Sequence, residues 1–374
     1  MENKVRNSGV ELLKIIGIML IVISHIVQTL ASNLSSNSSG FYLNIYHSTT
    51  NVTTFIIILL SHFGYLGNSI FFTCSAWFLV NHTKTNYKKI LYILADVFII
   101  SILWLIPMLF VFKSKLGLRN IITSLMPTFF GNNWYITTYI IFCFIYPILN
   151  AFFDKINQRT HLLLALVSFV IFILLGTVYG IFGINALLIW SSVYIAISYL
   201  QKYHKKAIES KKFNILLLLA SIFGFIFLLL AVNIIGLKIK AIGNRVQRFN
   251  NLSNIFFWLI AFCSLNLFKR IKWHSKKINY VSSLSLLVYL IHENILFRNK
   301  IRPLIWDLLI SHFGGNYVLI WIGIFALTLF LASYIIAFIY DISFRKPIKK
   351  LADRLYVCLV SIFNKIQNLT IKKN

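Results

Sequence analysis

Long apolar runs dominate this sequence, and they indicate that the chain folds in a lipid bilayer rather than in water. About ten stretches approach the twenty residues that cross a bilayer as an α-helix, and the eighth is short. A helix satisfies its backbone polar groups internally, as lipid requires. We therefore predict an all-α fold, a polytopic membrane helical bundle of about ten transmembrane helices near 8–31, 55–80, 90–112, 134–153, 161–180, 182–200, 213–235, 253–268, 279–298 and 316–341.

The composition supports one membrane domain. Only 12% of the 374 residues are charged, whereas a soluble domain is about one quarter charged. No linker or internal repeat divides the apolar runs, so we expect a single domain over 1–350 that contacts membrane lipids. The segment 351–374 is basic and has the pattern of an amphipathic helix lying on the inner leaflet.

The formal net charge of +27 could suggest nucleic-acid binding, but its distribution argues otherwise. The lysines and arginines form short clusters between apolar runs, the pattern that sets membrane topology. With the N-terminus in the cytoplasm, 26 of the 36 basic residues lie inside and ten lie outside. We therefore expect a multi-pass protein of the cell membrane with both termini in the cytoplasm. We expect no nucleic-acid partner.

The first apolar run carries a polar stripe. Lys14 and His25 are eleven residues apart, which places them about 20° from each other on one helix face and ~16 Å apart along the axis. Glu11 lies one turn before Lys14. Ionisable groups at membrane depth are costly and mark functional sites. The alternatives are that Lys14 anchors the helix at the interface, paired with Glu11, and that His25 is a structural histidine bonded to another helix.

These residue types suit a phosphate-bearing donor that enters from the cytoplasm. A lysine near the inner surface can hold the phosphates of an elongated donor, and a histidine can deprotonate a hydroxyl group. We therefore treat His25, Glu11 and Lys14 as candidate catalytic residues.

Two further spans carry polar or aromatic side chains that could bind a substrate. They are Asn68, Ser69 and Ser75 in the second span, and Trp134, Tyr135 and Tyr139 in the fourth. The small residues of the second span equally suit close helix packing. The first two aromatic residues of the fourth span equally suit an interfacial aromatic belt, whereas Tyr139 lies deeper.

The ninth span ends in a cluster of ionisable groups. Ser285 lies two turns before His292 on one face, and Tyr289 lies one turn before His292 and Glu293. Arg298 follows five residues later and could form an interfacial ion pair with Glu293. All five residues are candidates for substrate binding.

Several established motifs are missing from the sequence. There is no Walker A motif, no dinucleotide fingerprint, no nucleophile elbow and no paired Cys or His spacing typical of a metal site. We therefore predict neither a metal site nor a bound cofactor.

Taken together, the segments resemble the acyltransferase 3 family of integral-membrane acyltransferases. Its lead-in and first-helix signature, an acidic-Leu-Leu-Arg followed by histidine after ten intervening residues, is similar to 11–25. Its Gly-Val-Asp-x-Phe-Phe stretch resembles 67–79, its Trp-Tyr…Tyr…Pro-x-x-Asn stretch resembles 134–150, and its Ser…Tyr-Leu-x-His block resembles 285–292. These four motifs occur in the family's order and cover nearly the whole chain. The departures are that Lys14 replaces the arginine, Asn68 and Ser69 replace Val-Asp, and Ala76 replaces a common glycine.

The resemblance implies acyl transfer from cytoplasmic acyl-CoA, often acetyl-CoA, to a sugar hydroxyl of a surface or exported polysaccharide or of its lipid-linked precursor, in a bacterial plasma membrane. His25 would be the general base or a transient acyl carrier, Lys14 would bind donor phosphates, and Glu11 would position Lys14. The acceptor side would be lined by Tyr139, Tyr289, His292 and Glu293. Some members carry a fused extracellular domain; we expect this chain to acylate its acceptor directly or through a separate partner.

Two other functions remain open from the residues alone. An exporter or flippase for a glycan or its precursor would also need polar groups within the membrane, but the sequence has no inverted repeat and no paired broken helices. A glycan polymerase would need a larger outer loop with catalytic residues than the sequence provides.

Overall fold

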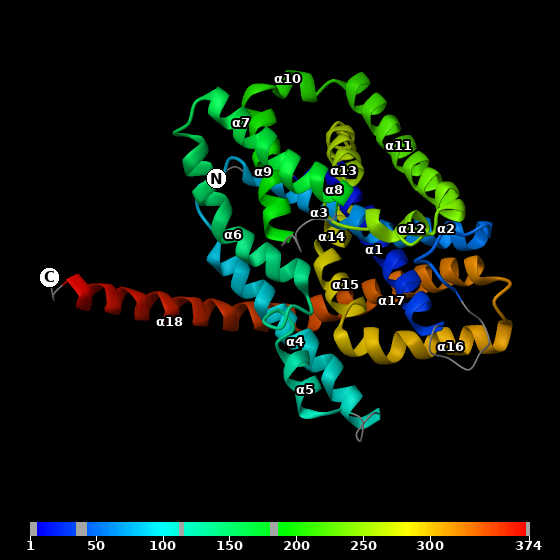
Figure 1. Ribbon diagram of the computed structural model, residues 1–374. Coiled ribbons are helices and arrows are strands. Elements are labelled where there is room, and N and C mark those ends of the chain that lie inside the picture. Colours follow the sequence, from blue (N-terminus) through cyan, green and yellow to red (C-terminus); the bar gives the residue numbers. More distant parts are fainter. Residues whose placement is uncertain (1–5, 35–42, 112–115, 180–185, 372–374) are drawn as a thin grey trace.

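The computed structural model describes residues 6–34, 43–111, 116–179 and 186–371, and within these ranges the regular structure is entirely helical (Figure 1). Three short segments are not α-helical: the π-helical η2 (Val170–Leu174) and η4 (Phe297–Ile301), and the 3₁₀-helical η3 (Val246–Phe249). The α-helices are α1 (Ser8–Leu34), α2 (Val52–Ser61), α3 (Phe63–Leu79), α4 (Tyr87–Val111), α5 (Leu118–Leu125), α6 (Trp134–Phe153), α7 (Gln158–Phe169), α8 (Leu175–Tyr179), α9 (Ala186–Tyr203), α10 (Lys205–Ile208), α11 (Lys211–Lys238), α12 (Lys240–Gly243), α13 (Ile255–Phe268), α14 (Lys276–Ser283), α15 (Ser285–His292), α16 (Arg302–Phe313), α17 (Val318–Ser343) and α18 (Arg345–Ile371).

The helices agree with the predicted membrane bundle, although fewer of them qualify as spans. Among the described residues, seven helical segments are long and apolar enough to cross a bilayer: α1, α2 with α3, α4, α6, α7 to α8, α11 and α17. Two predicted spans do not qualify among the described residues: α13 has only 14 residues, and α9 carries polar serine, tyrosine and glutamine side chains along its length. The all-α membrane fold is thus confirmed, whereas the described residues do not confirm the count of ten spans.

The predicted ninth span, 279–298, is bent in the structure. Its first part runs over Lys276–His292, and a second apolar helical part, Phe297–Phe313, continues at 56° to it. The two parts count as one broken span or as a re-entrant loop. The side-chain oxygen of Asn294 accepts from the backbone nitrogen of Leu296 at 3.0 Å, which helps the chain to restart as a helix. This second part was not predicted, because Arg298, Lys300 and Arg302 give it the pattern of an outer loop.

Helix α1 lies in the middle of the bundle and packs on α2, α3 and α13 to α17 (Figure 1). Its closest partner is α3, where Gly17 and Gly67 meet. A Cβ added at Gly67 would clash with the carbonyl oxygen of Gly17 and would lie 2.7 Å from the Ile21 side chain. The glycine therefore permits a close crossing that positions the polar stripe of α1.

The basic tail forms a helix, as predicted, but this helix begins at Arg345 rather than at 351. Figure 1 shows α18 (red) extending away from the bundle. Its first turns are held on α4, because Asp353 accepts from the Tyr92 hydroxyl at 2.7 Å and lies 3.2 Å from the Lys88 ammonium. Its placement on the inner leaflet stays a prediction.

Candidate functional site

Three ionisable side chains from distant parts of the sequence meet in the bundle. His25 comes from α1, His292 ends α15, and Glu293 follows it at the bend. The Nδ1 atom of His25 lies 2.9 Å from Oε2 of Glu293 and 3.2 Å from Nε2 of His292. The His292 side chain is fully buried and Glu293 nearly so, whereas His25 keeps a small exposed area. These three side chains form the candidate site.

The hydrogen bonds assign the protons on the two imidazole rings. Nδ1 of His292 lies 2.7 Å from the carbonyl oxygen of Val288, so this nitrogen carries the proton and donates. Nε2 of a neutral His292 is then an acceptor facing His25. Nδ1 of His25 therefore faces two acceptors and must carry its own proton. In the neutral form of His25, Nε2 then carries the free lone pair, by the same tautomer logic with which a carboxylate orients the histidine of a catalytic triad.

Two arginines hold the Glu293 carboxylate. Arg298 Nη1 lies 2.9 Å from Oε1, and Arg302 Nη2 lies 2.8 Å from Oε2. Arg302 is 1% exposed and also donates to the carbonyl oxygens of His25 and His292 and to the Thr29 hydroxyl, so it ties α1, α15 and α16 together. Sequence reasoning counted Arg302 as an outer-loop charge. The signal that could have found it is the largely apolar segment 303–310 that follows Arg302 directly.

The same three side chains could in principle hold a metal ion. One possible ligand atom each from His25, His292 and Glu293 lies within 4.8 Å of the others, a grouping that spacing along the sequence does not reveal. The carboxylate is already neutralised by two guanidinium groups. A divalent cation would therefore enter a net positive surrounding, and we interpret the cluster as a hydrogen-bond network.

One cavity, the outer cavity, opens beside His25 on the side predicted to face outward. Its volume is about 560 Å³, and Glu293 and Arg298 line it as well. Its other polar groups are uncharged apart from the Arg302 guanidinium. They include Gln28, Thr29, Ser32, Tyr46, Gln247, Asn250 and Asn299. Amide and hydroxyl groups of this kind suit a ligand rich in hydroxyls, such as a sugar.

A second cavity, the inner cavity, opens on the opposite side. Its volume is about 780 Å³, and its basic lining residues are Arg6, Lys14, Lys89, Arg345 and Lys349. Lys14 lies 3.3 Å from Glu11, which also accepts from the Ser282 hydroxyl at 2.6 Å. This arrangement fixes Lys14 at the cavity wall.

The inner and outer cavities approach each other at the histidine cluster. Ile21 and Tyr289 line the inner cavity. His25, four residues further along α1, and Glu293, the residue directly after α15, line the outer one. Four helical residues correspond to a rise of ~6 Å. The cluster therefore lies in a thin partition between two cavities on opposite sides.

The structure distributes the other predicted site residues over several places. The residues at the inner cavity are Asn68, Ser75, Tyr135, Tyr139, Ser285 and Tyr289. Tyr139 and Tyr289 had been expected on the acceptor side, together with His292 and Glu293; of these four, only Glu293 lines the outer cavity. Tyr139 instead accepts from the Lys89 ammonium at 3.2 Å, and Tyr289 lies one helical turn before Glu293, on the side of the inner cavity.

Three predicted residues, Ser69, Trp134 and His292, line neither the inner nor the outer cavity. Ser69 is fully buried between helices, which suits the packing interpretation of the second span. Trp134 packs against the apolar core, with its ring 5.8 Å from that of Tyr135. His292 is likewise covered, and it reaches the outer cavity only through His25.

Comparison with known protein families gives one match. A family model described as an acyltransferase domain matches residues 7–337, which is nearly the whole chain and includes every residue of the histidine cluster. No significant match is found among curated proteins or among solved structures. Helix α18 and its basic residues at the inner cavity lie beyond the matched region.

Proposed function

The chain belongs to this family of acyltransferase domains, and from that premise we propose that it is a membrane O-acyltransferase acting on a glycan. It would move an acyl group, an acetyl group in the simplest case, from cytoplasmic acyl-CoA to a sugar hydroxyl of a surface or exported polysaccharide or of its lipid-linked precursor. The observation that carries the proposal is the position of His25 in a thin partition between two cavities, with its Nδ1 directed at Glu293 and His292.

The inner cavity suits an acyl-CoA donor. It faces the side that the distribution of basic residues assigns to the cytoplasm, where acyl-CoA is found. Lysine and arginine side chains bind phosphate groups, and five of them line this cavity. With its phosphates at the mouth, the donor would extend its thioester along Ile21 and Tyr289 toward the histidine cluster.

The outer cavity suits the acceptor. A sugar there would place a hydroxyl group beside His25, since that side chain is part of the cavity wall. The proposed step begins when Nε2 of His25 takes the hydroxyl proton. The hydroxyl oxygen then attacks the thioester carbonyl carbon, and the carbon–sulfur bond breaks. The proton passes from His25 to the departing CoA sulfur, so that the products are the acyl ester and free CoA.

The residues around His25 have positioning roles in this proposal. Glu293 would hold Nδ1 of His25 and stabilise the imidazolium that forms when Nε2 gains a proton. Arg298 and Arg302 would keep Glu293 ionised and in place. His292 would fix the ring plane of His25 from the other side.

The decisive experiment is NMR of the surface glycan from a deletion strain, complemented with wild type, His25→Ala or His312→Ala. His312 is exposed on α16 and lies outside the cluster, so it is a matched control. We expect acyl signals to vanish on deletion, to return with wild type and His312→Ala, and to stay absent with His25→Ala despite normal membrane insertion. The shifted sugar proton then names the acceptor hydroxyl.

Other results would contradict different parts of the proposal. Normal acylation by His25→Ala would remove the general-base role. Unchanged acylation in the deletion strain, combined with glycan retained inside the cell, would favour an exporter or flippase. Acyl-CoA consumption by the purified protein is the direct biochemical check, because an exporter does not cleave the thioester.

A further inference from the structure

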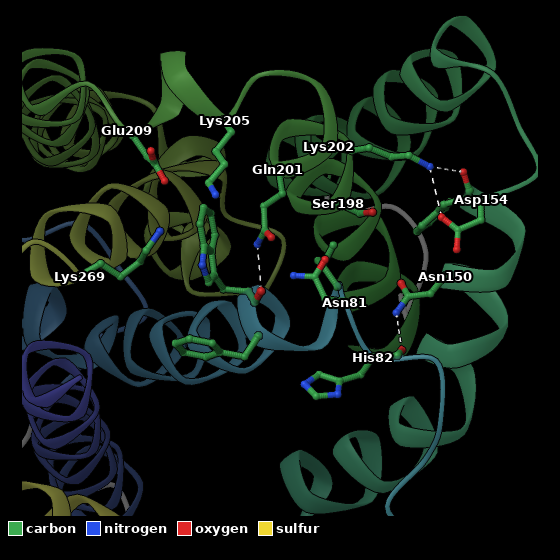
Figure 2. Close-up of a pocket in the computed structure, with 14 residues that line it drawn as sticks. Asn81, His82, Asn150, Asp154, Ser198, Gln201, Lys202, Lys205, Glu209 and Lys269 are labelled. Atoms are coloured by element: carbon green, nitrogen blue, oxygen red, sulfur yellow. Dashed lines mark hydrogen bonds and ion pairs between the residues drawn. The ribbon is translucent and has the colours of Figure 1, made fainter. Parts of the chain in front are cut away.

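A third cavity, the lysine cavity, lies where α3, α6, α9 and α13 end. Its volume is about 650 Å³, and it shares no lining residue with the inner or the outer cavity. It opens on the side that the basic residues assign to the cytoplasm. Figure 2 shows its side chains. The charged lining residues are Asp154, Lys202, Lys205, Glu209 and Lys269.

Helix ends alone do not explain these lysines. The last carbonyl groups of a helix attract cations, so a lysine there can have a purely local role. Lys202 has that role, because it donates to the carbonyl oxygen of Phe153 at 2.8 Å and lies 3.3 Å from Asp154. At the end of α3, carbonyl oxygens accept from the side chains of Asn150 and Gln201. The ends of α3 and α6 therefore do not require Lys205 or Lys269, of which Lys269 is the C-cap residue of α13.

Lys269 is unusual for a residue that only sets membrane topology. Such a lysine extends its ammonium group into water. The ammonium of Lys269 instead lies 3.5 Å from the centre of the Trp77 ring, and it has no salt bridge to a carboxylate in the described part of the chain. Burial lowers the pKa of Lys269 to about 8; Glu209 counters this shift, whereas Lys205 and Arg270 add to it. A bound anion would relieve this unfavourable charge.

The positions of Lys205 and Lys269 would allow both ammonium groups to bind the same anion. In Figure 2, Lys205 and Lys269 extend toward a common region at one end of the cavity, near Glu209, while the Lys202–Asp154 pair occupies the other end. Uncharged polar groups, among them Asn81 and Ser198, line the space between. Phe78, which is 49% exposed, adds an apolar edge.

We propose that the lysine cavity binds a phosphoryl group, supplied by the head group of an anionic membrane phospholipid. Basic pockets between transmembrane helices on the cytoplasmic side are typical sites for anionic head groups. Lys205 and Lys269 bind the phosphoryl oxygens, Ser198 and Asn81 contact the polar part of the head group, and Phe78 meets the start of an acyl chain. The site does not depend on the acyl-transfer proposal, because it lies apart from both the inner and the outer cavity.

The test measures lipid binding to the purified full-length protein in detergent by native mass spectrometry and by the midpoint of thermal unfolding. The probes are dioleoyl phosphatidylglycerol, dioleoyl phosphatidylcholine and inorganic phosphate. The double variant Lys205→Gln/Lys269→Gln removes both cations. The matched control Lys206→Gln/Lys272→Gln removes two exposed neighbours that do not line the cavity.

We expect phosphatidylglycerol to bind wild type and the control variant and to raise their unfolding midpoints, whereas phosphatidylcholine has little effect. The double variant should bind phosphatidylglycerol roughly 30-fold more weakly, since each basic residue near an anionic head group contributes several-fold. Lys269→Arg keeps the charge and should retain binding, which separates charge loss from misfolding. Acyltransfer should be unchanged in all these variants.

Two outcomes would contradict the proposal. The first would show that the phosphoryl group comes from a soluble ligand, and the second would show that the lysine cavity is not the binding site. A midpoint shift with inorganic phosphate that is lost in the double variant, without a matching lipid effect, keeps the phosphoryl site but makes its ligand soluble. Equal phosphatidylglycerol binding by the double variant, the control and wild type overturns the proposal, because the lipid then binds elsewhere through non-specific charge.

Discussion

At the scale of single residues, the behaviour of His25 depends on which ring nitrogen carries the proton. Glu293 decides this, because its Oε2 lies 2.9 Å from Nδ1 of His25. Glu293→Gln keeps the shape but removes the charge that would stabilise a protonated His25. By comparison with the carboxylate of a catalytic triad, we expect the kcat for acyl transfer to fall about 10³–10⁴-fold with a smaller change in the KM for acyl-CoA. Steady-state release of free CoA measures both.

The matched control at this scale is Glu209→Gln, which makes the same chemical change at an exposed residue of the lysine cavity. It should leave kcat and KM as in wild type. A kcat within twofold of wild type for Glu293→Gln would show that the carboxylate does not act through His25.

At the scale of elements, the crossing of α1 and α3 sets the position of His25. Gly67 has no room for a Cβ, because this atom would clash with the Gly17 carbonyl oxygen. Gly67→Ala should therefore push the two helices apart. We expect a loss of about 1–3 kcal/mol in the free energy of unfolding, a common cost of overpacking, together with reduced activity. Thermal or denaturant unfolding in detergent measures the first effect.

Gly323→Ala on α17 is the control for this substitution. A Cβ at Gly323 would meet no atom within 4 Å, so the change should be neutral or slightly stabilising. If Gly67→Ala were as stable and as active as Gly323→Ala, the close crossing would not be what positions His25.

At the scale of the whole molecule, the two-sided arrangement of donor and acceptor requires a defined orientation in the membrane. The excess of basic residues on one side predicts that α18 lies in the cytoplasm. Its Cys358 is exposed, whereas Cys74, Cys143 and Cys263 are buried. A membrane-impermeant maleimide should therefore label the protein in inside-out vesicles and leave it unlabelled in intact cells.

Two variants control this labelling experiment. Cys358→Ser should abolish the signal, which assigns it to α18. Lys240→Cys in that background adds a thiol at an exposed residue on the opposite side, and intact cells should label it. Labelling of Cys358 in intact cells would show that the orientation is the reverse of the predicted one, and the proposed donor and acceptor cavities would then be exchanged.

Much of the fold follows from local sequence, and so does part of the site. Apolar runs of membrane length predicted the helices, because a helix in lipid depends mainly on its own residues. The i,i+3 spacing of Glu11 and Lys14 predicted their ion pair, which the structure has at 3.3 Å. His25 and Glu293 were recognised because ionisable residues within apolar spans are rare.

The sequence by itself thus determined most of the helical segments, that they form a membrane bundle, and which polar residues are candidates for a site. Only the tertiary structure decided how these residues combine. His25 and His292 are 267 positions apart, and Arg302 reaches α1 only because the chain bends after His292. Helix periodicity places a side chain on a face, but it does not say which face of another helix it will meet. That choice depends on packing at positions such as Gly67, on the bend near Asn294, and on the burial of Arg302, and each of these results from contacts between distant segments.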